Sequence, residues 1–325
     1  MYTLRFDMRS PSGGPATAEL YAAALEMTAW AETHGAMAVI LSEHHGLRDG
    51  YLPSPLMLAS AMAARTSSIH IMTAVVILPL YDPVRLAEDL IVLDIISRGR
   101  ASVVCAVGYR SEEYAMFGED FEGRGRAADD KLRVLLQAKT GEPFDLDGAQ
   151  VCITPAPFTP GGPAVLWGGG SAVAARRAGR FGIDFFGQSG DPALLEVYEN
   201  EARRHGHEPG GCLLPAADMA TTVFVADDVD RAWDELGPYL MHDVTSYAAM
   251  NEGAGDRTSM SAATTADELR AENRSHRIVT VPEAVELARI GYLNLHPLVG
   301  GLPPEIAWPY LRRAGEDVMA ALATG

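Results

Sequence analysis

Residues 69–108 restrict the possible fold more than any other part of this sequence. Two nearly continuous apolar runs, 69–78 and 101–108, flank a segment in which apolar residues recur at helical spacing. Strands that are apolar on both faces are typical of parallel sheets covered by helices on both sides. We therefore predict two parallel strands joined by the helix between them.

The helix of this unit has recognisable ends. Asp82 is a suitable N-cap, and Pro83 suits the first turn because a missing N–H costs nothing there. Gly99 is expected to end the helix, since glycine readily adopts the left-handed conformation of a C-terminal cap. An apolar stripe for packing is predicted at Leu86, Leu90 and Leu93, widened by Ile91 and Ile95.

The rest of the chain repeats this alternation. About eight strand segments alternate with about eight helical segments, which implies parallel strands joined by right-handed crossovers. Eight such units favour a closed barrel over an open doubly wound sheet. We therefore predict an α/β protein in which residues 1–325 form a single (β/α)8 TIM-barrel domain. The active site of such a barrel lies at the carboxyl ends of its strands.

Composition narrows the classes of partner. The net charge of −17 argues against nucleic acid or an anionic membrane as a partner. Cys105, Cys152 and Cys212 lie far apart and suggest neither a zinc site nor a disulfide framework, so no metal is expected. The first residues lack the apolar core of a signal peptide, and no apolar run approaches the length of a membrane span. We expect a cytoplasmic protein.

Two long segments show no clear periodicity of apolar residues. Residues 140–162 contain four prolines and are interpreted as an excursion over the barrel surface. Residues 242–277 are polar and rich in Gly, Ser and Thr, with one possible helix at 266–275. Long, weakly ordered segments inside a compact domain are usually lids or disordered loops. We predict a mobile lid at 242–277, after the seventh strand.

A Glu-His-His turn follows the second predicted strand. Neighbouring side chains on a turn point in different directions, so at most one of His44 and His45 needs to face the pocket. A histidine there can transfer protons near neutral pH. The alternative is a structural or surface histidine pair. A metal site is a weaker interpretation, because no other cluster has matching ligand spacing.

A glycine turn at Gly168–Ser171 follows the fifth predicted strand and opens a helix. Glycines let the backbone approach a ligand, and a helix N-terminus offers free N–H groups to a phosphate. The alternative is a tight strand-to-helix connection. Arg110, Arg124 and Arg126 could supply a cation for the phosphate, or could pair with the local acids Glu112, Glu113 and Glu122.

These motifs, in this order, resemble those of the bacterial luciferase-like flavin-dependent monooxygenases. The similarity extends over essentially the whole chain. The matching segments are Ser42–His45, Thr73–Val76, the P-V-R-x-A-E helix with the S-x-G-R end at 82–100, Glu113–Gly118, Arg124, Trp167–Gly169 and the tail 281–318.

The resemblance implies a site for reduced FMN, or for the deazaflavin coenzyme F-420. It implies a cis peptide between Ala74 and Val75, a proton-transfer role for His44, and a lid after strand seven. It also implies that Gly169, Gly170 and Ser171 hold the cofactor phosphate, with Arg124 as cationic partner, and Gly168 is expected to contact the cofactor. His45, Tyr109 and Gln188 are the residues that we expect to face the substrate.

Two positions depart from luciferase itself. Luciferase has an arginine closely after its fourth strand, where this chain has Ala106, so Arg110 is the candidate substitute. Luciferase also has an acid before the phosphate-binding serine, where this chain has Gly170. The resemblance therefore does not imply light emission.

The function expected from the resemblance is a monooxygenase that uses reduced FMN and O2 to oxygenate a small organic substrate. A separate flavin reductase would supply the reduced FMN, and a homodimer is expected. One alternative is a deazaflavin-dependent oxidoreductase that transfers hydride without oxygen chemistry. A second alternative is a non-catalytic flavin-binding protein.

Overall fold

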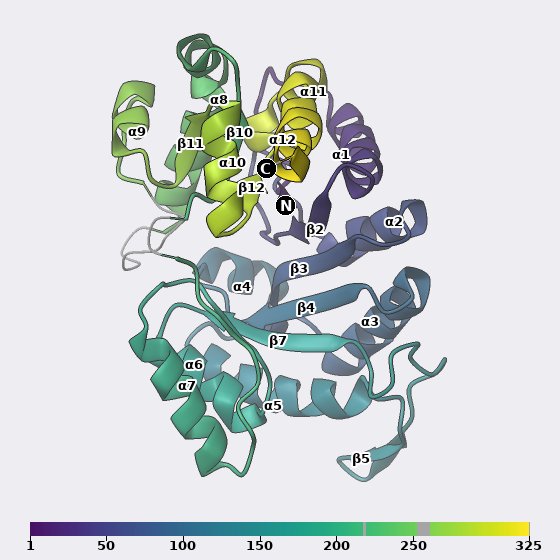
Figure 1. Cartoon of the computed structure of the whole chain (residues 1–325). Coiled ribbons are helices and arrows are strands. Elements are labelled where there is room, and N and C mark those ends of the chain that lie inside the picture. The colour runs from purple at the N-terminus through teal and green to yellow at the C-terminus, as the bar shows by residue number, and fades with distance from the viewer. Residues whose placement is uncertain (217–218, 252–260, 325) are drawn as a thin grey trace. The chain divides into compact units, whose positions relative to one another are not determined.

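The structure is a computed structural model that describes residues 1–216, 219–251 and 261–324. The chain divides into two compact units. The first unit contains residues 1–53 and the described residues from 219 onward, and the second contains residues 54–216. Both units are built from parallel strands covered by helices (Figure 1), which confirms the predicted α/β class.

The first unit has five parallel strands among its described residues. Their order is β11-β10-β12-β1-β2. Leu295, Leu4 and Val39 lie side by side on three neighbouring strands, and all three are buried. This row forms part of the core. The strands are β1 (Tyr2–Phe6), β2 (Ala36–Leu41), β10 (Thr222–Val225), β11 (His276–Val279) and β12 (Leu293–Leu295).

Six helices belong to the first unit in the described part of the chain. The longest is α8 (Val229–Met250), whose N-cap Asp228 accepts a hydrogen bond from the backbone of Arg231. A π-helical segment, Arg313–Val318, joins the last two helices. The other helices are α1 (Thr17–Glu32), α9 (Ala266–Glu272), α10 (Val281–Ile290), α11 (Pro304–Arg312) and α12 (Met319–Thr324).

The second unit also has five parallel strands, in the order β3-β4-β7-β8-β9. One row of side chains crosses the sheet through Val76, Cys105, Trp167 and Phe185, all of them fully or almost fully buried. Cys105 is therefore a core residue. The strands are β3 (His70–Ile77), β4 (Ala101–Ala106), β7 (Ala164–Gly169), β8 (Phe185–Gly187) and β9 (Cys212–Leu213).

The second unit's helices cover this sheet. Figure 1 shows α5, α6 and α7 grouped beyond β7, while α3 lies beside β4. The helices are α2 (Pro55–Arg65), α3 (Pro83–Ser97), α4 (Ser111–Phe117), α5 (Arg124–Ala138), α6 (Ala172–Phe181) and α7 (Ala193–Arg204).

Helix α3 begins where it was predicted to begin. Its buried apolar stripe and its C-terminal cap differ from the prediction. The Asp82 side chain accepts hydrogen bonds from the backbone N–H groups of Val84 and Arg85, at 3.0 and 2.9 Å. The left-handed cap is Arg98, with φ of 54°, and Gly99 follows with φ of 79°. Ile95 was expected in the buried stripe, but its side chain is exposed because the buried face turns toward Leu86, Leu90, Ile91 and Leu93.

The segment predicted as a lid contains regular structure. Residues 242–250 continue helix α8, and residues 276 and 277 belong to β11, where His276 pairs in parallel with Thr222 of β10. The prediction of one weakly ordered segment is wrong for these residues, since polar composition did not reveal the buried face of the helix. The part of the predicted lid at 252–260 lies outside the described residues.

The excursion at 140–162 contains a hairpin that the sequence pattern did not predict. Strands β5 (Phe144–Leu146) and β6 (Ala149–Val151) pair in antiparallel fashion around Asp147 and Gly148, which both have positive φ. Both strands are short and largely exposed, so they leave no apolar pattern in the sequence. Among the helices of the described residues, none combines the length and the apolar character needed to cross a membrane.

Candidate functional site

Polar side chains occupy alternate positions at the end of β1. Arg5 lies in β1, and Asp7 and Arg9 follow its last residue, Phe6. Arg9 Nε donates to Asp7 Oδ2 at 3.1 Å, and the Arg9 backbone N–H lies 3.3 Å from Asp7 Oδ1. His296 Nε2 lies 3.4 Å from Asp7 Oδ1. Asp7, Arg9 and His296 are all buried, so the carboxylate of Asp7 and the guanidinium of Arg9 compensate each other away from water.

The environment of Asp7 favours its ionised form. Burial by itself would raise the pKa of this carboxyl, but the charge and hydrogen bond of His296, and then the charges of Arg9 and Arg5, outweigh it. The pKa of Asp7 is therefore held well below its usual range. Asp7 is an anion at neutral pH and a permanent partner for the guanidinium of Arg9.

A second buried acid, Asp243, lies on helix α8. Its Oδ2 accepts from His276 Nε2 at 3.0 Å. Burial opposes ionisation of Asp243, but the hydrogen bond from His276 and the charge of Arg5 lower its pKa. Asp7, Asp243 and His296 each place one potential ligand atom within 4.8 Å of the others. Arg9 already donates to Asp7, so we interpret this cluster as a charge network and assign no metal to it.

The Glu-His-His turn follows β2 in the first unit. His45 Nε2 lies 2.6 Å from Glu43 Oε1, and both side chains are buried. The ring of His44 contacts Tyr51 edge to face, with the ring centroids 4.8 Å apart and the planes at 81°. The two histidines therefore differ: His45 is held by a carboxylate, whereas the ring of His44 packs against an aromatic side chain.

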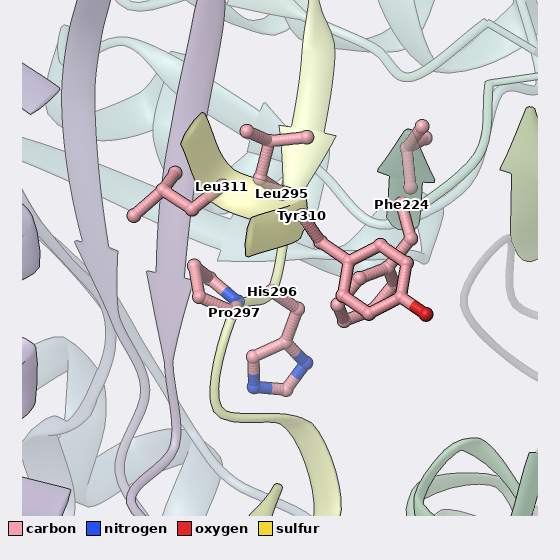
Figure 2. A pocket seen from close by; sticks show the side chains of 7 residues that line it. Phe224, Leu295, His296, Pro297, Tyr310 and Leu311 are labelled. Carbon is pink, nitrogen blue, oxygen red and sulfur yellow. The ribbon is translucent and has the colours of Figure 1, made fainter. Parts of the chain in front are cut away.

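A small pocket lies in the first unit, among residues from β10, β12 and α11 (Figure 2). Its lining is mostly apolar and includes Phe224, Leu295 and Leu311, with His296 at one edge. The Tyr310 hydroxyl donates to Glu235 at 2.6 Å. The pocket has few polar groups that could orient a ligand, so we interpret it as a packing gap under α11.

The glycine turn lies at the end of β7 in the second unit. A Cβ atom on Gly168 would lie 3.1 Å from Val75 Cγ1 and 2.8 Å from Val104 Cγ1, so Val75 and Gly168 are neighbours. The predicted cis peptide between Ala74 and Val75 is present. The structure thus places Val75 of β3 beside the glycine turn.

The start of helix α6 completes this turn. Ser171 is the N-cap, and its hydroxyl accepts from the Ala174 backbone at 3.3 Å. Gly169 has φ of 152°, and a Cβ atom on it would lie 2.6 Å from Ala174 Cβ. The Gln188 backbone N–H donates to the Gly169 carbonyl at 3.0 Å, which places Gln188 beside the turn. First-turn N–H groups of a helix lack helical acceptors, so this end can bind an anion.

The arginines predicted as phosphate partners have local contacts. Arg110 Nη1 lies 3.1 Å from Glu113 Oε1, which is the alternative pairing that the sequence left open. Arg124 donates to the Phe121 carbonyl at 2.6 Å, and its guanidinium lies 3.8 Å from the Phe121 ring centroid. Their role as phosphate partners remains a prediction, as do the substrate roles of His45, Tyr109 and Gln188.

Arg177 is a buried arginine that the sequence pattern did not single out. It is buried on α6, pairs with Asp129, and its guanidinium lies 5.0 Å from the Trp167 ring centroid. Nothing in the sequence distinguished it from Arg176 or Arg180 on the same helix, since only packing decides which of the three is enclosed.

Residues 3–286 match the model of the family described as luciferase-like monooxygenase. This chain belongs to that family. A similar curated protein is the alkanal monooxygenase alpha chain of Photorhabdus luminescens, 27% identical over 187 residues, which are 54% of this chain and 52% of the relative. The 4-hydroxyprotoasukamycin monooxygenase of Streptomyces nodosus subsp. asukaensis is 26% identical over 241 residues, 70% of this chain and 65% of the relative.

Solved structures of other proteins share the fold of this family member. Monooxygenase RslO1 from Streptomyces bottropensis has a TM-score of 0.78 at 19% identity, over 99% of both chains. The oxygenating constituent of 3,6-diketocamphane monooxygenase from Pseudomonas putida, in complex with FMN, has a TM-score of 0.69 at 18% identity over 98% of both chains. A secondary alcohol dehydrogenase dependent on coenzyme F-420 has a TM-score of 0.63 at 16% identity over 91% of both chains.

The structural matches, at these low identities, establish the fold alone. The family member spans about half the length of the first curated relative it matches. Its cofactor, substrate and partners therefore have to be inferred from its own residues.

Proposed function

We propose that this chain is the oxygenase of a two-component flavin-dependent monooxygenase. It would use reduced FMN, delivered by a separate reductase, and O2 to oxygenate a small organic substrate such as an aldehyde or ketone. The observation that carries the proposal is the buried His44, placed directly after a parallel strand in a chain of the luciferase-like family. The closed (β/α)8 barrel and a cytoplasmic location belong to the same proposal.

The residues of the second unit fit a flavin phosphate. The glycine turn has no side chains of its own at Gly169 and Gly170, and the first-turn amides of α6 supply donors. A Cβ atom on Gly169 would collide with Ala174, so the close approach of turn and helix depends on glycine. A phosphate dianion is suited to this arrangement because it meets both N–H groups and the positive end of the helix dipole.

Different residues of this chain would bind the phosphate, support the cofactor and transfer the proton. When bound, reduced flavin supplies the electrons with which one oxygen atom enters the substrate and the other leaves as water. Gly169–Ser171 would hold the phosphate, and Ala74 and Val75 would support the cofactor beside the turn. The imidazole of His44 would accept or donate the proton of the reaction.

The proposal is tested by titrating the purified protein with reduced FMN and, separately, with coenzyme F-420, following fluorescence under anaerobic conditions. We expect FMN to bind more tightly, and aldehydes and ketones then to gain one oxygen atom from labelled O2. Tight binding of coenzyme F-420 with weak FMN would favour hydride transfer, an alternative to which the fold similarity to a coenzyme F-420 enzyme lends support. Binding without any turnover would favour a flavin-binding protein.

Gly169→Ala is expected to weaken FMN binding about tenfold or more, which is about 1.4 kcal/mol. The new methyl group would lie 2.6 Å from Ala174 Cβ and force the start of α6 away from the turn. The dissociation constant from the same titration measures the effect. Gly161→Ala is the matched control, because Gly161 also has positive φ but no atom within 4 Å of its added Cβ. Equal affinity in the two variants would contradict the phosphate assignment.

We also propose that the homodimer forms through helices α2 and α3. Val92, Ile95 and Ile96 form an exposed apolar stripe on α3, and Met57 of α2 is 75% exposed. Ile96→Lys is expected to convert the dimer to a monomer, measured by light scattering during gel filtration. Ile290→Lys, which alters an exposed apolar residue of α10, is expected to leave the dimer intact. A dimer that survives Ile96→Lys would place the interface elsewhere.

A further inference from the structure

A pair of tyrosine hydroxyls connects helix α8 to the segment that carries His44. Tyr51 Oη lies 2.6 Å from Tyr247 Oη. Tyr247 Oη also accepts a hydrogen bond from the guanidinium of Arg5. Because an arginine can only donate, the direction of this second hydrogen bond is fixed. Tyr247 is therefore held from β1 on one side and holds Tyr51 on the other.

The other end of this chain of contacts is His44. The Tyr51 ring lies edge to face with the His44 ring. The backbone is also fixed there: the His44 N–H donates to the Leu52 carbonyl at 3.2 Å, and the Leu52 N–H donates to the Asp7 carbonyl at 2.8 Å. The residue next to Tyr51 is thus bonded both to the backbone of His44 and to the end of β1.

The hydroxyl pair persists across the pH range of a working enzyme. Burial raises the pKa of Tyr51 to about 12, and burial likewise raises the pKa of Tyr247 well above its ordinary value. Both hydroxyls therefore keep their protons near neutral pH. The guanidinium of Arg9 lies 4.7 Å from the Tyr51 ring centroid and 5.0 Å from that of Tyr247, which adds a cation–π contact to each ring.

A second contact attaches the same helix to the same loop. His242, which precedes Tyr247 on α8, places Nε2 3.0 Å from Asp49 Oδ2. Asp49 also accepts from Arg9, and its backbone carbonyl accepts from the Ser10 N–H at 2.6 Å. The contacts of Asp49 thus hold this loop independently of the tyrosine pair. Loss of the hydrogen bond between the tyrosines should therefore free the Tyr51 ring and leave the rest of the loop in place.

We propose that Tyr247 is a positioning residue for His44 and acts through Tyr51. The Tyr247 hydroxyl fixes the ring against which the His44 imidazole rests. This inference rests on the proposed proton-transfer role of His44. Small misplacements of a reacting group cost large factors in rate, so an anchored ring is of use next to such a residue.

The first test is an NMR comparison of the protein without cofactor. Tyr247→Phe keeps the ring under Arg9 and removes only the hydroxyl. An aromatic ring 4.8 Å away shifts the resonances of the His44 ring hydrogens, so we expect these resonances, assigned with His44→Gln, to move in Tyr247→Phe. Tyr310→Phe is the matched control, because it removes a hydroxyl bonded to Glu235 and should leave the His44 resonances in place.

The second test measures turnover with reduced FMN. Tyr247→Phe is expected to lower kcat about tenfold and to leave the KM for flavin unchanged, whereas a general loss of structure would alter both. Tyr51→Phe should have the same effect, and the double variant should be no worse than either single one, because all three lose the same hydrogen bond. If Tyr247→Phe does not fold, Tyr51→Phe tests the same hydrogen bond.

The two tests separate the possible failures. His44 resonances that stay in place in both single variants overturn the positioning role, whatever the activity. The positioning role is also overturned if the His44 resonances move but an active enzyme keeps its kcat, since His44 then does not need the fixed ring. If the resonances move and the parent protein oxygenates nothing, the positioning of His44 stands and the proposed monooxygenase function fails.

Discussion

His44→Ala is expected to reduce kcat by about 10²–10⁴-fold, the range typical of a lost proton-transfer group. His44 lies directly after a parallel strand of a luciferase-like chain, and its ring rests on Tyr51. The rate of formation of oxygenated product measures the effect. Affinity for FMN should change little, because the phosphate is predicted to bind at Gly169–Ser171 and not at His44.

The neighbouring histidine provides the comparison for this experiment. His45 is bonded to Glu43 at 2.6 Å, so His45→Ala should affect KM for the substrate and stability more than kcat. Added imidazole should restore part of the turnover of His44→Ala, because a free imidazole can occupy the vacated space and transfer the proton. If His44→Ala turns over at the parent rate, the proton-transfer role is wrong.

Asp7→Asn is expected to lower the free energy of unfolding by about 3 kcal/mol or more at pH 7. Asp7 and Arg9 are both buried, and the change leaves the guanidinium of Arg9 without the carboxylate bonded to its Nε. Urea unfolding followed by circular dichroism measures the difference. Asp227→Asn is the control, since Asp227 pairs with Arg313 at the surface and its loss should cost less than about 1 kcal/mol.

The effect of Asp7→Asn should depend on pH in a defined direction. The pKa of Asp7 is lower in the folded protein than in the unfolded chain, so its ionisation stabilises the fold above the unfolded value of about 3.9. This stabilisation is lost as the pH falls through the pKa that Asp7 has in the folded protein. The difference between parent and variant should therefore be constant from about pH 5 to 8 and shrink below about pH 4. A difference equal to that of Asp227→Asn at pH 7 would contradict the buried ion pair.

The sequence alone determined the α/β class and the elements with strong local signals. Helix α3 begins where Asp82 and Pro83 predict, because a cap and a proline act within one turn. The buried strand β4 and the glycine turn before α6 were likewise evident, since an apolar run and a glycine-rich turn are local properties. The cis peptide at Ala74 followed from the family resemblance and not from any local pattern.

Tertiary structure decided which polar residues form a network. The partners of Asp7 come from residues 9 and 296, and Tyr247 reaches Tyr51 across 196 residues of sequence. No periodic pattern encodes such distant pairs. The only available signal was the run of charged residues Arg5, Asp7 and Arg9 in and directly after an apolar strand, because charged groups that become buried require partners.

The same reason explains why helix α8 extends into the segment predicted as a lid. Residues 242–250 open the segment 242–277, whose overall polar composition suggested a lid. In the folded chain Asp243 meets His276, and Tyr247 meets Arg5 and Tyr51. Sequence determines where apolar faces and helix ends lie, because those are short-range effects. Only the folded chain determines which polar side chains are buried together, because the free energy of burying a charge depends on partners that local sequence does not contain.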